Sequence, residues 1–165
     1  MLGRLFRPIA SAFAALFLCL SASPALAADI SFEKAPLTVT TADGRAHAFT
    51  VELALESEQR AQGLMNRREM AGDAGMLFDF GETRRVLMWM KNTYLPLDML
   101  FIASDGRIET IRENAVPLSE SIIDSGVPVA FVLELNAGSA ERLGIAPGDH
   151  VESRQIAASP QAARP

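Results

Sequence analysis

The sequence predicts an α+β fold that is predominantly β: a compact, partly closed antiparallel β-barrel or sandwich with two short helices. Three observations predict this. Apolar and polar residues alternate over short runs, as in half-buried strands. Gly-containing turn signals separate about eight such runs, and helical spacing occurs in only two places. The 165 residues suit a single domain.

The first predicted element is a β-hairpin. Strands over Leu37–Thr41 and Ala46–Leu55 flank Asp43-Gly44, a dipeptide typical of tight hairpin turns. In the second strand the odd-numbered residues from Phe49 to Leu55 are all apolar, whereas Thr50, Glu52 and Glu56 are polar. This period of two predicts one buried and one solvated face.

The remaining strands are predicted from apolar runs bounded by turn signals. They cover Met76–Phe80, Val86–Asn92, Leu97–Ala103, Ile108–Arg112, Val129–Leu135 and His150–Ser153. Asp105-Gly106 marks a second hairpin. The connection Pro117–Pro128 is long for a small barrel. It is either a functional lid or an edge meander that returns Ile122 and Ile123 to the core.

Two short helices interrupt the strands. The first is predicted over Glu58–Met65, with Ser57 as its N-cap. The second is predicted over Ser139–Leu143, and Gly144 follows where a left-handed residue closes a helix. Ala146-Pro147-Gly148-Asp149 then places Pro and Gly at the centre of a type II turn.

Both ends of the chain differ from the middle. Residues 1–27 have the features of a secretory signal peptide: Arg4 and Arg7, the apolar run Ile9–Leu20, and Ala25-Leu26-Ala27 at the cleavage site. The run is too short to span a bilayer, so no transmembrane anchor is expected after cleavage. Residues 28–154 are the predicted domain, and the polar residues 155–165 a disordered tail. We expect a periplasmic or secreted protein.

Charge and cysteine content exclude several functions. With 15 Lys+Arg against 20 Asp+Glu, the net charge is −5, so no nucleic-acid partner is expected. Cleavage would leave 138 residues and remove the one cysteine, Cys19. Thiol chemistry and Cys-ligated metals are then excluded. No cofactor is predicted.

Several short motifs occur in one order along the chain. They are Arg60-x-x-Gly63-Leu64-Met65-x-Arg67, Gly75-Met76-Leu77-Phe78, Met88-Trp89-Met90-Lys91-Asn92-Thr93, Pro96-Leu97-Asp98, Glu134-Leu135 with Gly138, and Gly148-Asp149. In these the sequence resembles the bacterial and archaeal domain of unknown function 192 family, over roughly residues 36–153. Met88 departs from the aromatic residue expected before the Trp. The resemblance implies a small single β-rich domain and no assigned activity.

Two carboxylates are candidates for a binding site. Asp98 has the strand parity of Leu100 and Ile102, and Glu134 has that of Val132, so both are expected to face apolar layers. A buried carboxylate needs a partner, because leaving it unpaired costs several kcal/mol. Arg60, Arg67 and Lys91 are candidate partners, and Trp89 offers a stacking face. The predicted ligand-binding residues are Arg60, Arg67, Trp89, Lys91, Asn92, Asp98 and Glu134.

These residues leave four interpretations open. The leading functional hypothesis is non-enzymatic binding of a small polar ligand or an envelope component. A carboxylate-based hydrolase that acts on cell-envelope polymer through Asp98 and Glu134 is an alternative. Cu(I) binding is another, because Met88 and Met90 would share a strand face and a histidine, His47 or His150, could add a nitrogen ligand. A structural ion-pair and capping network would also explain the charges.

Overall fold

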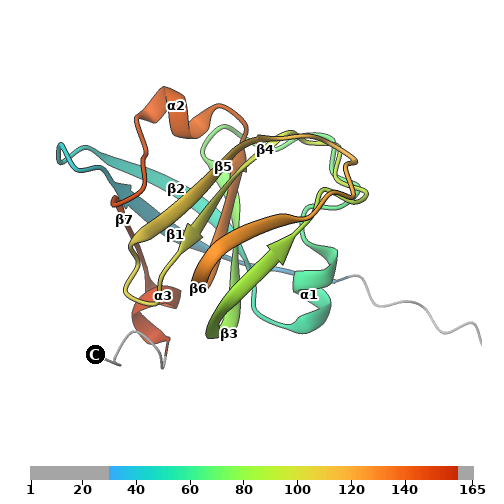
Figure 1. Cartoon of the computed structure of the whole chain (residues 1–165), viewed down its shortest axis with the longest axis horizontal. Helices are drawn as coiled ribbons and strands as arrows, with labels where there is room; N and C mark the ends of the chain where they lie inside the picture. The colour runs from blue at the N-terminus through green and yellow to red at the C-terminus, as the bar shows by residue number, and fades with distance from the viewer. Residues whose placement is uncertain (1–29, 160–165) are drawn as a thin grey trace, which may run out of the picture.

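Seven strands form one sheet in the computed structural model, which describes residues 30–159. The predicted signal peptide and residues 160–165 lie outside that range. The strands are β1 (Glu33–Thr40), β2 (Ala46–Ala54), β3 (Ala74–Met88), β4 (Leu97–Ile102), β5 (Ile108–Ala115), β6 (Ile123–Asn136) and β7 (His150–Ser153). Their order across the sheet is β5-β4-β6-β3-β2-β1-β7. The sheet curls into a half-barrel, which confirms the predicted fold class (Figure 1).

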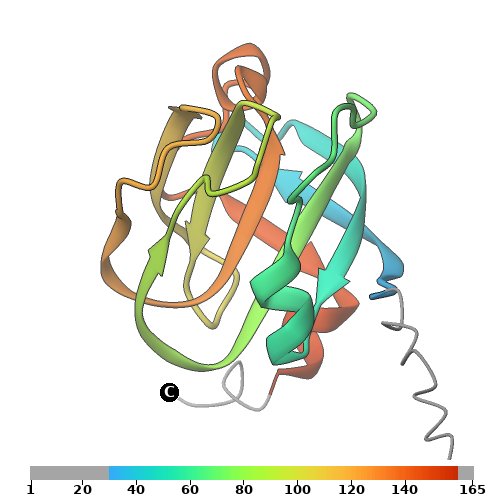
Figure 2. The same ribbon diagram turned by 90° about the vertical axis from the view of Figure 1, so that its right-hand side faces the viewer.

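The two edges of the sheet meet at one point, which closes the curl further. Arg107 and His150 form an isolated antiparallel bridge between them. The N–H of Ile108 donates to the carbonyl of Asp149 at 2.9 Å. Figure 2 shows the curled sheet from the side, with α1 (Ser57–Gln62) in front of it. All strand pairs are antiparallel except β2 with β3, which run parallel and are joined through a helix. The predicted antiparallel architecture therefore contains one parallel pair.

The long strands β3 and β6 bend where their pairing is irregular. Their pairing shifts register between Asp79 and Arg84, as expected where a bulge bends a strand. Gly81, at φ +70°, lies within this bend. The predicted strands 76–80 and 86–92 are therefore one bent strand that ends at Met88. Residues 117–128 are likewise part strand, since β6 begins at Ile123 and pairs there with Met88.

Two apolar clusters lie on opposite faces of the sheet. The inner core collects residues from all seven strands and so lies inside the curl, with Leu77, Leu100 and Phe131 among its members. The outer core lies against the other face of β3, β4 and β6; it includes Met76 and Met99 and is covered by segments around Leu64, Met90 and Leu95. Among residues 30–159, the structure contains no helix with the length and apolar character needed to cross a membrane.

Three short helices are described rather than two. The first, α1 (Ser57–Gln62), has Glu56 rather than Ser57 as its N-cap, because Glu56 and Gln59 form a reciprocal capping box. The second, α2 (Ser139–Leu143), ends at Gly144 with φ 69° as predicted. In Figure 1, α2 lies above the strands.

The third helix, α3 (Arg154–Ala158), lies beside the end of β7 and corrects the prediction of a disordered tail from residue 155 (Figure 1). The side chain of Ser153 accepts a hydrogen bond from the N–H of Ile156. Ile156 is buried in the inner core. This one aliphatic side chain anchors a segment whose composition is otherwise too polar to pack.

Candidate functional site

Four acidic residues are buried in the described structure: Asp79, Asp98, Glu134 and Asp149. Burying a carboxyl group without hydrogen-bond donors is costly, because water is lost and nothing replaces it. The partners of each carboxyl group therefore separate those that hold the fold together from those that are free to bind something else.

Asp98 is held on both oxygens by backbone groups. Its Oδ1 accepts from the N–H of Asn114 in β5 at 2.9 Å, and its Oδ2 accepts from the N–H of Ala140 in α2 at 2.9 Å. The residue thus ties a strand end and a helix to β4. Its full set of partners is that of a structural residue.

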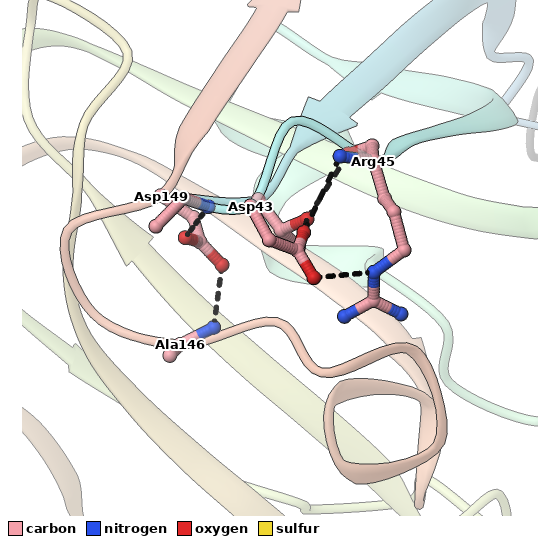
Figure 3. Close-up of polar contacts among 6 residues, drawn as sticks. Asp43, Arg45, Ala146 and Asp149 are labelled. Carbon is pink, nitrogen blue, oxygen red and sulfur yellow. Dashed lines mark hydrogen bonds and ion pairs between the residues drawn. The ribbon is translucent and has the colours of Figure 1, made fainter.

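Asp149 has the same kind of structural role beside the turn between β1 and β2 (Figure 3). Its Oδ1 accepts from the N–H of Ala42 at 2.8 Å and its Oδ2 from the N–H of Ala146 at 2.7 Å, so it joins two turns. Exposed Asp43 nearby has a pKa lowered to about 2, because the Thr41 hydroxyl and then Arg45 donate to it. Figure 3 shows the Asp43–Arg45 pair beside Asp149.

Asp79 is also satisfied. It accepts a hydrogen bond from the N–H of Gly81 at 2.8 Å and another from Nε2 of Gln155 at 2.7 Å. The second contact connects the bend of β3 with α3.

Glu134 is the exception among the four. Glu134 in β6 is 4% exposed. Within residues 30–159 its side chain makes no hydrogen bond or ion pair, and burial is the only cause of its pKa shift. Its oxygens keep some contact with solvent, since the fully buried side-chain atoms without a partner in these residues are His47 Nε2 and Ser159 Oγ. Its neighbours in register are Met76 of β3 and Met99 of β4, neither of which can pair with a carboxylate. Burial raises the pKa of Glu134 from 4.5 to about 8. The group is therefore mostly protonated at neutral pH.

Glu134 faces a pocket of about 130 Å³ between the segment that follows α1 and the end of β3. The lining is mainly apolar, aromatic and thioether: Arg60, Ala61, Gln62, Gly63, Leu64, Met65, Phe78, Phe80, Leu87, Met88, Trp89 and Glu134. The other charged side chain of that lining is Arg60, whose Nη1 donates to the carbonyls of Leu55 and Asp79, the latter at 2.9 Å. The pocket can therefore offer one uncharged carboxyl group on an apolar floor.

Three of the seven predicted ligand-binding residues line this pocket: Arg60, Trp89 and Glu134. Trp89 is 45% exposed, which leaves much of its ring accessible. Asp98 does not join them. Met99 pairs with Glu134 and Asp98 with Leu135, so Asp98 and Glu134 project from opposite faces of the sheet.

The other three predicted residues do not line the pocket. Arg67 pairs with Glu52 through two hydrogen bonds, one of 2.9 Å, which lower the pKa of the Glu52 carboxyl. Lys91 places Nζ 5.2 Å from the centroid of the Trp89 ring. Asn92 accepts a hydrogen bond at its carbonyl from the N–H of Asn66 at 2.9 Å.

The geometry removes the paired-carboxylate hydrolase. Its two carboxylates would have to flank one scissile bond, and they lie on opposite faces of the sheet. The methionine pair also fails as a shared strand face, because β3 ends at Met88 and Met90 is fully buried in the outer core. Within residues 30–159, no three or more His, Cys, Asp or Glu side chains form a metal-binding group.

Sequence reasoning missed most of the pocket floor. Gly63, Leu64, Met65 and Phe78 line it. All four belong to motifs that carry the family resemblance, and membership in those motifs was the one feature of the sequence that pointed to them. Their apolar character made them look like ordinary core residues.

Comparison with known proteins identifies relatives of known structure. The model of the DUF192 family, described as "Uncharacterized ACR", matches residues 38–153. A crystal structure from Sinorhizobium meliloti 1021, described as a "putative transcription regulator", is 67% identical, with a TM-score of 0.75 over 76% of this chain and 97% of that chain.

A second crystal structure, of a protein of unknown function from Novosphingobium aromaticivorans DSM 12444, is 42% identical. Its TM-score is 0.72 over 80% of this chain and 94% of that chain. A comparison with curated proteins finds no match.

Proposed function

The chain belongs to the DUF192 family, and on that premise we propose that it is a small domain that binds a polar ligand in the Glu134 pocket without catalysing a reaction. The carrying observation is that Glu134 alone, of the four buried acids in residues 30–159, has no partner. Asp79, Asp98 and Asp149 use their carboxyl groups to hold the fold together, whereas Glu134 holds nothing.

The energetic cost of burying the Glu134 carboxyl group supports a binding role. Burial without a partner destabilises the ionised form of Glu134, as the raised pKa of its carboxyl group indicates. An apolar residue at position 134, between Met76 and Met99, would avoid that cost. A ligand that pairs with the carboxyl group would offset this cost, and the offset would contribute to the free energy of binding.

Two further residues suit recognition of a polar ligand. Trp89 presents a partly exposed ring at the pocket, suited to stacking. Arg60 also lines the pocket, where its Nη1 is held by two backbone carbonyls and its guanidinium carbon lies 6.0 Å from the centroid of the Phe80 ring. Together with Glu134 they give the pocket an apolar floor with a few polar groups, the usual composition of a small-molecule site.

We also propose that the domain acts outside the cytoplasm, on a ligand or component of the envelope. The basic start, apolar run and Ala25-Leu26-Ala27 of the leader support this. N-terminal sequencing of the protein recovered from a periplasmic or culture fraction should begin at Ala28. Recovery of the uncleaved chain from the cytoplasm would contradict export.

The description of one similar structure as a transcription regulator does not change this proposal. Binding to DNA draws on clustered positive charge, and this chain has a net charge of −5. We therefore propose no nucleic-acid partner.

NMR titration with a panel of small ligands tests the proposed function. The panel holds an alkylammonium salt, a carboxylate, an amide, an alcohol and a sugar. We expect at least one member to shift the amide of Gly63 and the indole N–H of Trp89, because both residues line the pocket. Glu134→Gln should weaken that response, and Glu152→Gln, the same change at an exposed position of β7, should leave it intact. Shifts only elsewhere, or none with any member, would refute the proposal.

A further inference from the structure

We propose that the Glu134 pocket takes an organic ammonium group, which forms an ion pair with the Glu134 carboxylate. The inference rests on the proposed function, since it names the ligand class for the same pocket. It follows from three features of the pocket: a missing countercharge, a lining that accepts cations, and too few donors for a bare metal ion.

The protein supplies no positive charge to Glu134. The groups that face it from the neighbouring strands are the uncharged side chains of Met76 and Met99. Arg60, the other charged residue of the lining, is directed to the carbonyls of Leu55 and Asp79. Burial alone perturbs the carboxyl group, with no opposing effect from a nearby cation. An ammonium ligand would bring the missing charge.

The lining suits an alkylated cation. Phe78 provides an aromatic ring, which attracts cations, and Met65 and Met88 provide polarisable sulfur. The Phe80 ring already carries two cations of the protein, Arg60 at 6.0 Å and Arg84 at 5.0 Å from its centroid. The Nζ of Lys91 lies 5.2 Å from the centroid of the Trp89 ring, so a ligand cation would share this ring with a cation of the protein. A volume of about 130 Å³ has room for a small alkylammonium group.

A bare metal ion fits less well. Hard divalent ions take several oxygen ligands, and the pocket lining offers a single carboxyl group. A soft ion such as Cu(I) would find the two thioethers of Met65 and Met88. The remaining lining is hydrocarbon and aromatic, which contacts an alkyl chain well and coordinates no metal.

The proposal fixes how binding depends on pH. Glu134 is protonated in the free protein at neutral pH, and its proton must leave before the ammonium ion pairs with it. Binding therefore releases a proton, and the affinity rises about tenfold for each pH unit up to the pKa of the free pocket. A neutral acceptor held by the protonated carboxyl group would show the opposite dependence, losing affinity as pH rises.

Calorimetric titration of the mature protein with n-butylammonium chloride tests the inference, with n-butanol as the uncharged control of similar shape. Between pH 6 and pH 8 we expect the affinity for n-butylammonium to rise at least tenfold. Repeating the titration in two buffers of different ionisation enthalpy should detect proton release. Glu134→Gln should weaken n-butylammonium binding at pH 8 at least tenfold, whereas Glu152→Gln should not. Circular dichroism checks that both variants are folded.

Each other outcome has a defined meaning. If n-butanol, butyrate or acetamide binds the pocket and n-butylammonium does not, the ammonium inference is wrong and the proposed function stands. Silver ion, a redox-stable probe for soft-metal sites, would overturn the inference if it alone shifts the Met65 and Met88 methyl signals. Failure of the whole panel would overturn both proposals.

Discussion

Replacing Glu134 by Gln should change how the stability of the protein depends on pH. The amide has nearly the shape of the protonated carboxyl group and cannot ionise. In the wild type, the folded state holds its proton up to about pH 8, whereas the unfolded chain releases it near 4.5. Between these values the folded state binds more protons, so the free energy of unfolding falls as pH rises.

The pKa difference sets the size of the effect. The rise in the pKa of Glu134 from 4.5 to about 8 corresponds to a loss of at most roughly 5 kcal/mol in the free energy of unfolding. Local relaxation and water entry lower this, so we expect a few kcal/mol. Below pH 4.5 the carboxyl group is protonated in both states, and above about 8 it is ionised in both. The loss is therefore confined to the interval between them.

Urea unfolding of the two proteins at matched pH values measures the difference. The Gln variant should equal the wild type within about 1 kcal/mol near pH 4.5 and exceed it by a few kcal/mol at pH 8.5. Effects of overall charge are largely common to both proteins and cancel. Glu152→Gln, an exposed change, should stay within about 0.5 kcal/mol of wild type throughout. A Gln–wild-type difference that is constant with pH would refute the reasoning.

Further predictions concern the residues assigned structural roles. Asp98→Ala should lower the free energy of unfolding by about 2–3 kcal/mol in urea titrations, because it orphans the buried N–H of Ala140 and the part-buried N–H of Asn114. A double-mutant cycle of Arg67→Met and Glu52→Gln should give a coupling of about 1 kcal/mol or less that shrinks with salt, since the pair is partly exposed. Ile156→Ala should cost about 2–4 kcal/mol and speed hydrogen exchange in α3; unchanged exchange would contradict its anchoring role. Met90→Leu should cost less than about 1.5 kcal/mol, as for a core filler.

Much of the fold could be predicted from the sequence because its turns and helix ends are determined by residues close together in the chain. Asp43-Gly44 and Asp105-Gly106 form the predicted hairpins, and Gly144 closes α2. The errors arose where distant contacts decide. Nothing local to α3 shows that Ile156 meets the inner core. The parallel pairing of β2 with β3 likewise depends on the path of the chain between them.

The candidate site was only partly readable for the same reason. Strand parity correctly indicated that Asp98 and Glu134 are buried. The parity of a residue within one strand does not show whether its side chain lies on the same face of the sheet as a residue in another strand. That depends on the register between strands, in which Asp98 lies opposite Leu135 and Met99 opposite Glu134. A register shifted by one residue would place Asp98 and Glu134 on the same face of the sheet. The observed register puts Asp98 on the face where it caps α2 and Glu134 on the face of the pocket.

Glu134 is a buried carboxyl group that the protein leaves without a partner within residues 30–159. The most direct test of this claim is the side-chain carboxyl ¹³C shift of Glu134, followed by NMR against pH and assigned by comparison with Glu134→Gln. We predict a midpoint near pH 8 in the free protein, which moves lower when n-butylammonium is present. A midpoint near the usual 4.5 would contradict the account.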